Sequence, residues 1–347
     1  PPHKSNQDWF RNPIENLVIG RDDGHAQCPQ HPGEPAEKTE PETAAAAAGG
    51  ITNLCCPPDT QPVIDTPAVA QLVAQTAGRR GKARVIPAGA LTKGLAGEQI
   101  SEMAALKQAG CPVMSNGNRP IVNTLVQRRA LEYAATFDLT VFLHADDHWL
   151  SNSGCVHEGR VATRMGLPGI PEAAETAAVA RDLALVQQIG VRAHFCHLTS
   201  ERAARMVARA QYDGLPVSAD VAVPYLYLSE IDISDFNTQC HLIPPLRTVE
   251  DRQGLREALC RGTLSAICSD HQPHEPDAKE RPFPETEPGI SGLETLLGLT
   301  LRLGRGRRGG ATVLADQRLE QATHAGLDLL TRSDSLTYSI SLIQSVL

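Results

Sequence analysis

One carboxylate and two imidazoles follow a short apolar segment late in the chain. Leu264–Cys268 has the composition of a buried strand, and Asp270, His271 and His274 come directly after it. In a parallel α/β barrel the catalytic side chains sit at the carboxyl ends of the strands, because the strands hold them rigidly while the loops vary. An acid beside imidazoles suits a metal-assisted hydrolase, in which Asp270 would be the base that moves the proton of an activated water molecule.

Two further histidines stand at the ends of apolar segments. His144 closes the segment Thr140–His144, and His197 follows Arg192–Cys196. At such a position a histidine is either a hydrogen-bonded structural residue or a metal ligand. His194, three residues before His197, lies on the opposite face of the strand by parity, so we expect it to be a hydrogen-bonded core residue.

Short apolar segments alternate with amphipathic segments through the middle of the chain, and these elements must position the polar residues. The expected strands are Thr52–Cys56, Arg84–Ala88, Cys111–Ser115, Thr140–His144, Arg192–Cys196, Pro216–Asp220 and Leu264–Cys268. The expected helices include Glu98–Ala109, Leu125–Thr136, Glu172–Gln188 and Glu201–Ala210. Seven strands with crossover helices, plus a damaged or missing first strand, indicate an eight-stranded (β/α) barrel. The alternative is a doubly wound open sheet, which is disfavoured because no glycine-rich phosphate loop follows an early strand.

The helix expected from Glu172 carries the usual start and stop signals. Pro171 precedes it, Glu172 and Glu175 occupy its first turn, and Gly190 follows its last turn. We expect both carboxylates to face the positive end of the helix dipole.

The two ends of the chain have a less regular pattern than the middle. The start is polar and rich in proline, with one candidate strand at 15–19 and an expected loop at 29–41. An alanine run, Ala44–Ala48, reads as a helix that Gly49 and Gly50 end. We divide the chain into an irregular segment at 1–43 with a remnant of the first strand, a barrel at 44–303, and a C-terminal tail at 304–347 in which 311–330 could form a helix.

Composition excludes several classes of partner. The 347 residues carry a formal net charge of -8, which does not favour nucleic acid or an acidic membrane surface. No apolar run reaches the roughly 18 residues that a membrane-spanning helix needs, and the start lacks the pattern of a signal peptide. The nine cysteines are an odd number and mostly fall in expected strands. This usage favours buried, reduced thiols and a cytoplasmic location.

Several motifs together carry a resemblance to a known family. Ser269-Asp270-His271-Gln-Pro-His274, then Lys279, then Pro288-Gly-Ile-Ser-Gly-Leu-Glu294 resembles the last-strand signature of dihydroorotases in the amidohydrolase superfamily. Pro244-Pro-Leu-Arg247 and the stretch from Ala44 to Thr52 extend the resemblance to about residues 31–300. It implies a TIM-type barrel of the metal-dependent hydrolase kind. Such proteins usually add a small β-sandwich built from both termini, and we expect it to be missing or vestigial here.

The resemblance also assigns the metal ligands. It implies His144, His197 and Asp270 at three ligand positions of a site that holds two cations in the family. The anionic bridge between those cations would stand where this chain has Asn116, and a neutral amide cannot offset two positive charges. The two histidines of the first strand are replaced by Ala26 and Cys28.

A rescue of the first-strand position is conceivable, because the spacing His25-x-x-Cys28-x-x-His31 offers three side chains that can bind a metal. No framework of cysteine and histidine surrounds this spacing, and His25 is one residue out of register, which turns a strand side chain to the opposite face. The expected cofactor is therefore none, or one weakly bound zinc ion.

The positions that bind the substrate carboxylate in the family are also altered. Gln30 replaces an arginine, Asp59 replaces an asparagine and places an anion against an anion, and Ile243 replaces a second asparagine. Replacing a cation by an amide removes a charge-assisted pair worth roughly 2–3 kcal/mol. His274 and Arg247 join Asn116 and Asp59 as substrate-side candidates. His271 is at most an outer or substrate-side residue.

Two functions follow from the resemblance. The first is a non-catalytic, dihydroorotase-like subunit that assembles with the catalytic chain of aspartate carbamoyltransferase in pyrimidine biosynthesis, as an oligomer. The alternative is an active zinc-dependent hydrolase of cyclic amides, with a mononuclear site in which Asp270 is the base.

Overall fold

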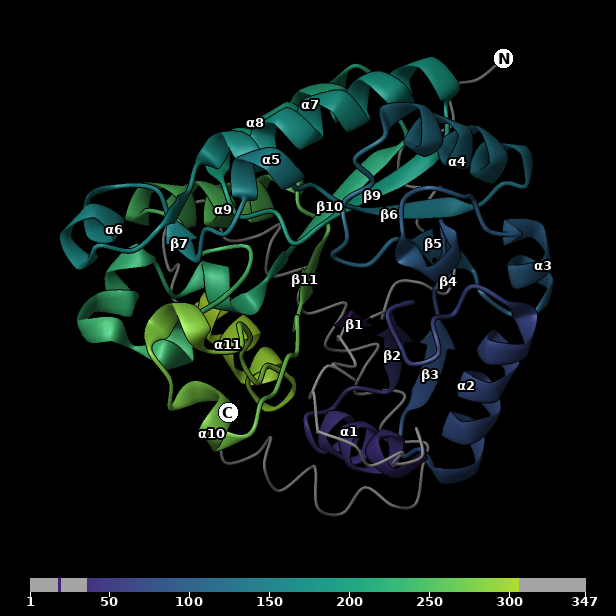
Figure 1. Ribbon diagram of the computed structural model, residues 1–347, viewed down its shortest axis with the longest axis horizontal. Coiled ribbons are helices and arrows are strands. Elements are labelled where there is room, and N and C mark those ends of the chain that lie inside the picture. Colours follow the sequence, from purple (N-terminus) through teal and green to yellow (C-terminus); the bar gives the residue numbers. More distant parts are fainter. Residues whose placement is uncertain (1–17, 20–35, 306–347) are drawn as a thin grey trace.

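Parallel strands form the centre of the computed structural model, which describes residues 18–19 and 36–305 (Figure 1). One sheet has the order β1-β2-β3, and a second has the order β11-β10-β9-β6-β5-β4. All of their pairings are parallel. The strands are β1 Val18–Ile19, β2 Asn53–Cys56, β3 Arg84–Pro87, β4 Gly89–Ala90, β5 Val113–Ser115, β6 Thr140–His144, β9 Arg192–Cys196, β10 Val217–Ala222 and β11 Ala266–Cys268.

The two sheets follow one another in the order of the sequence. Only Ala88 separates β3 from β4, so the short sheet continues into the long one. This order has no reversal and therefore no switch point, which rules out the doubly wound alternative. β1 contacts β11 across the remaining gap, but no strand pairing joins them in the described residues. The fold is an α/β arrangement with a parallel sheet that curves toward a barrel without closing it.

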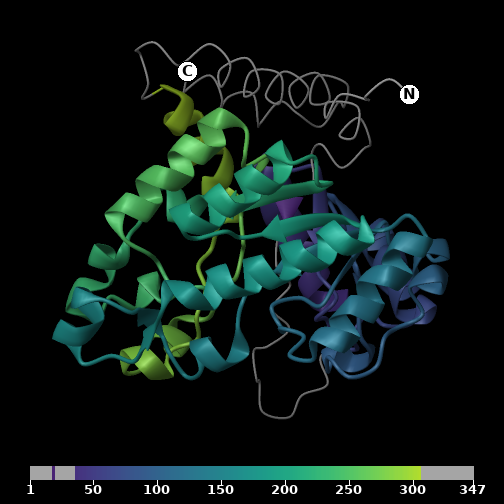
Figure 2. The ribbon, with the colours of Figure 1, turned by 90° about the horizontal axis from the view of Figure 1, so that it is seen from above.

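Helices cover the outer side of the strands. They are α1 Ala36–Ala48, α2 Pro67–Arg80, α3 Met103–Gln108, α4 Thr124–Thr136, α5 His148–Ser151, α6 Arg160–Met165, α7 Glu172–Ile189, α8 Glu201–Tyr212, α9 Val249–Arg261, α10 Pro276–Lys279 and α11 Leu293–Arg305. Seen from above, the early units and the late units lie on opposite sides, with α7 and its strands between them (Figure 2). A small separate pair, β7 Val156–His157 and β8 Gly169–Ile170, is formed by the segments before and after α6. None of the described helices is long and apolar enough to span a bilayer.

The expected strands agree with the structure to within two residues at each end, and β6 and β9 have the expected bounds. Two other expectations are wrong in part. The loop expected at 29–41 ends early, because α1 already begins at Ala36 and includes Pro41. The helix expected from Glu98 begins only at Met103, because Ile100 pairs with Thr92 in a β-bridge.

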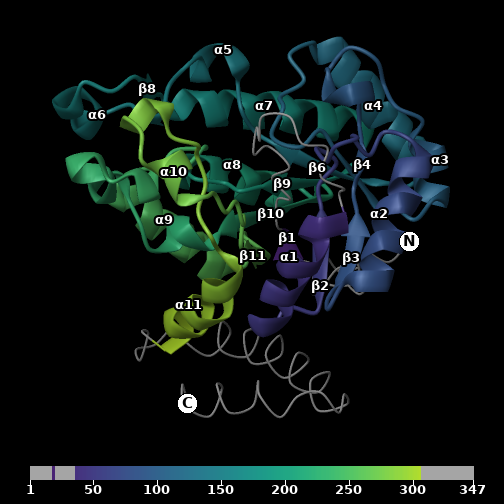
Figure 3. The same cartoon turned by 60° about the horizontal axis from the view of Figure 1, so that its bottom comes forward.

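The first and last described helices pack side by side (Figure 3). Ala46 of α1 and Leu293 and Leu296 of α11 belong to one small buried cluster. The helix proposed for 311–330 lies outside the described residues. The expected loss of the β-sandwich stays a prediction, because both termini also lie outside them.

Glu175 lies in the first turn of α7, as the helix pattern predicts, and has a further role. It is buried rather than facing solvent at the start of α7. Its Oε1 accepts hydrogen bonds from the amide and hydroxyl of Thr199, at 2.6 and 3.1 Å, and its Oε2 accepts from the amide of Ser200 at 3.0 Å and from its hydroxyl. Glu175 therefore fixes the segment between β9 and α8, which includes the candidate site.

Candidate functional site

His144 and His197 line one small cavity at the carboxyl ends of the strands. Their ring centroids lie 6.2 Å apart. The cavity has a volume of about 30 Å³ and is lined by Cys55, Pro57, Ala88, Ser115, Gly117, Asn118, Phe142, His144, Cys196 and His197. A single water molecule needs roughly 10–15 Å³ by this kind of measure. The cavity is thus large enough for an ion or a few water molecules.

His197 is a buried histidine whose ring has no hydrogen bond. Its exposed fraction is 6%, and neither ring nitrogen has a hydrogen-bond partner in the described structure. Oδ1 of Asp270 is 4.0 Å from Nδ1 of His197, and it accepts a hydrogen bond of 2.9 Å from Nε2 of Gln272. His144 and His197 therefore share one cavity and Asp270 lies beside His197, while the joint role of the three as metal ligands stays a prediction.

The backbone at two of these residues is strained. His197 and Asp270 have φ values of 56° and 43°, in the left-handed region that residues other than glycine rarely adopt. Such conformations cost about 1–3 kcal/mol and persist where the surrounding structure holds them. Here Asp220 is one such restraint, because its Oδ1 accepts a 2.7 Å hydrogen bond from the backbone amide of His197.

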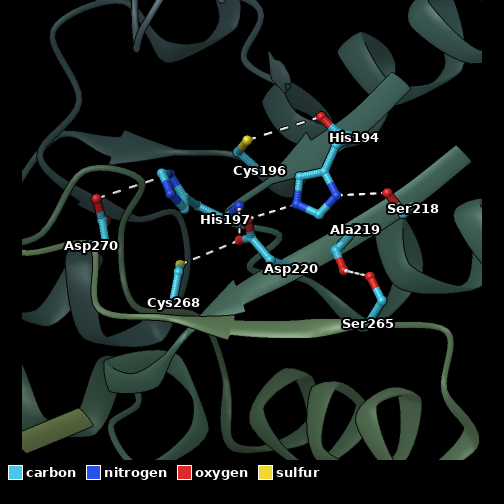
Figure 4. A network of polar contacts seen from close by, with 9 residues as sticks. All are labelled: His194, Cys196, His197, Ser218, Ala219, Asp220, Ser265, Cys268 and Asp270. Atoms are coloured by element: carbon cyan, nitrogen blue, oxygen red, sulfur yellow. Dashed lines mark hydrogen bonds and ion pairs between the residues drawn. The ribbon is translucent and has the colours of Figure 1, made fainter. Parts of the chain in front are cut away.

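Asp220 is the centre of a buried polar network that the sequence reading did not identify (Figure 4). It is fully buried on β10. Its Oδ2 is 2.9 Å from Nε2 of His194, whose Nδ1 is 2.7 Å from the hydroxyl of Ser218. The thiol of Cys268 donates to Oδ1 of Asp220 at 3.4 Å. His194 is thus a hydrogen-bonded core residue, as expected from the parity of its strand.

The pKa values of the carboxyl group of Asp220 and of the neighbouring thiols are shifted in opposite directions. Burial alone would raise the pKa of Asp220, but the charges of His197 and His194 and the hydrogen bonds that they donate lower it below its usual value. Burial, followed by the nearby Asp220 and Asp270 carboxylates, raises the pKa of Cys268 well above its usual value. Burial likewise raises the pKa of Cys196. The network therefore holds an anionic carboxylate and neutral thiols.

Asn116, at the position of the expected bridge, does not line the cavity. Its Oδ1 accepts a hydrogen bond of 2.7 Å from the hydroxyl of Thr92. Its Nδ2 donates to the carbonyl oxygens of Arg119 at 2.8 Å and Leu95 at 3.4 Å. The amide thus ties together the loops that follow β4 and β5.

The other substrate-side candidates occupy different environments. A Cβ atom added to Gly117, in the cavity lining, would lie 3.6 Å from the carboxylate of Asp59, so this acid stands at the cavity edge. Arg247 is buried, and its guanidinium donates to the hydroxyl of Thr199, to the carbonyl oxygen of Ile170 and toward Nδ1 of His157. These bonds make Arg247 a structural residue, and its substrate-side role stays a prediction.

The two histidines after Asp270 hold neighbouring segments. Nδ1 of His271 accepts hydrogen bonds from the amides of Gly292 and Leu293 at the start of α11, so its Nε2 carries the proton and donates to Glu42 of α1 at 2.9 Å. Nε2 of His274 is 3.0 Å from the carbonyl oxygen of Pro288. Both histidines are therefore outer residues in this structure.

The glycine motif that follows has a steric explanation. Gly292 passes so close to Ser269 that an added Cβ atom would lie 2.4 Å from its carbonyl oxygen. Gly289 has a φ value of 147°, and an added Cβ atom would lie 2.6 Å from Gln272. The motif is needed to pack the segment before α11 against the strand end that carries Asp270.

The donor set fits one metal ion better than two. His144, His197 and Asp270 supply two imidazoles and one carboxylate, and the buried ring nitrogens of His197 without partners are what a histidine ligand presents when its ion is absent. A paired site also needs an anionic bridge, and Asn116 cannot supply it. Ala26, Cys28 and Gln30, which replace the first-strand residues of the family, lie outside the described residues, as do His25 and His31.

Asp220 and Cys268 are the polar residues at the site that the sequence reading missed. Both lie within segments that were read only as strands. One signal was available in the sequence. His194 and Cys196 are two positions apart on one strand, as are Ser218 and Asp220 on the next, and residues at this spacing point to the same face of a sheet.

Comparison with known proteins supports one family. The profile described as Dihydro-orotase-like matches residues 23–203. A "Dihydroorotase-like protein" of Pseudomonas putida is 55% identical over 262 residues, which are 76% of this chain and 62% of the relative's length. A "Dihydroorotase" of Syntrophotalea carbinolica is 42% identical over 287 residues, which are 83% of this chain and 68% of that protein.

Solved structures agree on the fold. An L-hydantoinase from Arthrobacter aurescens superposes with a TM-score of 0.69 at 23% identity, covering 81% of this chain and 63% of that one. A Saccharomyces cerevisiae dihydroorotase in complex with 5-fluoroorotic acid superposes with a TM-score of 0.66 at 16% identity, and the match covers 93% of this chain and 86% of that one. These neighbours have TIM-barrel folds and support the same fold for this chain. The profile and the sequence relatives show that this chain belongs to the dihydroorotase-like family.

Proposed function

We propose that this protein is a non-catalytic, dihydroorotase-like subunit that supports aspartate carbamoyltransferase in pyrimidine biosynthesis. The observation that carries the first part is the position of Asn116. Both polar atoms of its amide are used by loop hydrogen bonds, so the residue at the bridge position is neither charged nor in the cavity.

The loss of the bridge has a direct electrostatic consequence. Two cations at the separation of roughly 3.5–4 Å found in paired sites repel each other, and an anion between them must offset that repulsion. With Asn116 neutral, and with Ala26 and Cys28 in place of two imidazoles, the second cation has no ligand set. The activated water of a paired site then has no source.

Substrate binding is weakened independently. Dihydroorotate is an anion, and Asp59 at the cavity edge presents a like charge to it. Gln30 and Ile243 supply no compensating cation at the other altered positions. A protein that had kept its chemistry would have had no reason to lose both the metal bridge and the carboxylate pocket.

The proposal includes a reducing, cytoplasmic setting and an oligomer with the transcarbamoylase. Every described cysteine is a free thiol, and all of them except Cys260 are buried. Free, buried thiols fit a compartment that keeps cysteines reduced.

The test of the catalytic part is a turnover assay with added Zn²⁺. The proposal predicts that the purified chain converts dihydroorotate no faster than the Asp270→Asn variant, in which any rate from a contaminating enzyme would persist. Turnover at ordinary enzyme rates, roughly 1–10³ s⁻¹, that disappears in the variant would overturn it.

The partner is tested separately by co-expression with aspartate carbamoyltransferase. One co-eluting peak on gel filtration at micromolar concentration is the expected result. Two separate peaks would contradict the assembly and leave the catalytic conclusion untouched.

A second function is favoured by His197, whose two buried ring nitrogens have no hydrogen-bond partner. An active hydrolase with a single ion on His144, His197 and Asp270 would use those nitrogens. The ion would polarise the ring amide and acidify a water molecule, and Asp270 would hold the proton. Asp59 favours a neutral or cationic ring amide over dihydroorotate. Hydrolysis of such amides that needs both Zn²⁺ and His144 would establish this function.

A further inference from the structure

Three possible metal ligands from three neighbouring strands meet beneath the cavity. Asp220 lies on β10, Cys268 ends β11, and His197 follows β9. One ring nitrogen of His197, one carboxylate oxygen of Asp220 and Sγ of Cys268 all lie within 4.8 Å of one another, and all three residues are buried. Figure 4 shows their side chains converging from the three strands.

The His197 ring is the independent sign of a ligand. A buried imidazole normally satisfies at least one ring nitrogen, as His194 does here with Asp220 and Ser218. Neither ring nitrogen of His197 has a hydrogen-bond partner, although the residue is only 6% exposed and thus 94% buried. Leaving such a group unpaired is unfavourable, and a bound ion would give one ring nitrogen a partner.

The distance between the carboxylate oxygen of Asp220 and the sulfur of Cys268 matches that expected for two ligands of a tetrahedrally coordinated ion. With metal–sulfur and metal–oxygen distances of about 2.3 and 2.0 Å, a tetrahedral angle puts the two donor atoms about 3.5 Å apart. Sγ of Cys268 and Oδ1 of Asp220 are 3.4 Å apart. Only the His197 ring, within the 4.8 Å limit, needs to come closer.

The mixture of donors selects the kind of ion. Mg²⁺ and Ca²⁺ prefer oxygen ligands, whereas a set of sulfur, nitrogen and oxygen suits Zn²⁺. We propose that His197, Asp220 and Cys268 form a buried zinc site that pins β9, β10 and β11 together. The thiol proton that Cys268 now donates to Asp220 leaves to solvent when the ion takes its place.

This site differs from the His144, His197 and Asp270 set in one decisive respect. It contains sulfur, and the other set does not. The two sets share His197, so one zinc ion would occupy one or the other. The inference goes beyond the proposed function, since a buried structural ion is compatible with a non-catalytic subunit.

Cobalt is the probe that distinguishes the two sets. The full chain is expressed in zinc-limited medium with Co²⁺, because a buried site fills during folding, and its absorption spectrum is recorded. A thiolate–cobalt charge-transfer band in the near ultraviolet, with one ion per chain, is the expected result. The band should persist in His144→Ala and in Cys240→Ser, a control that removes another buried thiol, and it should be lost in Cys268→Ser.

Two results would overturn the site: a folded, cobalt-grown chain without the band, or a band that survives in folded Cys268→Ser. X-ray absorption at the zinc edge of the unmutated chain needs no variant. It should show one sulfur at about 2.3 Å, and a shell of nitrogen and oxygen alone would contradict the proposal. Neither measurement depends on turnover, so the proposed function can fail while this site stands.

Discussion

The ends of the late strands and the ends of the early strands differ in how their polar residues are held. On β9, β10 and β11 and directly after β9, polar residues bind one another: His194, Asp220, Cys268 and His197 form one connected network. After β2 and β5, Asp59 and Asn116 stand in separate loops. The three residues that the resemblance implies as metal ligands are His144, which ends β6, and His197 and Asp270, which follow β9 and β11.

The difference indicates which of these polar residues the folding stability depends on. Asp220 cannot change without leaving three donors unsatisfied, and each loss costs about 1–3 kcal/mol. Position 116 is different, because an amide there serves the neighbouring loops well. Asp220 therefore contributes to folding stability whatever the catalytic use of the site.

The largest effect is expected at Asp220. Asp220→Ala removes the acceptor of the His197 amide, the His194 ring and the Cys268 thiol. We expect a loss of about 4 kcal/mol in the free energy of unfolding, measured by urea denaturation. The control is Asp138→Ala, whose carboxylate is 79% exposed and pairs with Arg192, with an expected loss of about 0.5 kcal/mol. Equal losses of unfolding free energy in Asp220→Ala and Asp138→Ala would show that the buried network contributes no more to stability than an exposed ion pair.

Arg247→Met tests whether the stability of the region around β9, β10 and β11 also depends on a buried cation. The change removes the hydrogen bonds to Thr199 and Ile170 and the charge that offsets burial of Glu175. We expect a loss of about 3 kcal/mol, against about 0.5 kcal/mol or less for Arg205→Met, an exposed helix residue. A stable Arg247→Met chain with altered ligand binding would instead support the substrate-side role.

The pH dependence of stability provides a third test. Burial, aided by the positive charge of Lys279, lowers the pKa of His241 from 6.5 to about 4. The unfolded chain therefore binds a proton that the folded chain excludes between these values, so stability falls as the pH falls from 6.5 to 4, by about 2 kcal/mol. His241→Gln, which keeps a donor for Thr286, should flatten this part of the profile. An unchanged profile would remove His241 as its cause.

The smallest effect is expected from restoring the family's carboxylate. Asn116→Asp replaces the donor to the carbonyl oxygens of Arg119 and Leu95 by an anion, and we expect a loss of about 1 kcal/mol in unfolding free energy. Asn152→Asp, at an exposed position, should cost less. No dihydroorotate turnover should appear in Asn116→Asp, because Ala26 and Cys28 still replace two ligands. A gain of turnover would contradict this expectation and would show that the residue at position 116 alone decides between the active and the inactive protein.

The fold could be predicted further than the site. Continuous apolar segments such as Thr140–His144 fix strand bounds by themselves, and the order of strands follows from the alternation with helices. The start of α1 could not be predicted, because Pro41 lies inside it and proline normally ends such a pattern.

The site residues predicted from the sequence, such as His144 and Asp270, were those at or after a strand end that also match the family's motifs. Asp220 ends the expected strand Pro216–Asp220 but lies inside β10, which runs to Ala222. It was missed because its charge becomes meaningful only when the neighbouring strand is known. The burial of Arg247 and Glu175 could not be predicted for a related reason. Their burial depends on contacts between elements far apart in the chain, which no local pattern contains.

Anomalous diffraction from crystals grown with excess Zn²⁺ tests the central claim most directly. The account predicts no pair of ions in the cavity that His144 and His197 line, because no anion stands between the positions they would take. Two zinc ions about 3.5–4 Å apart beside Asp270 would contradict it.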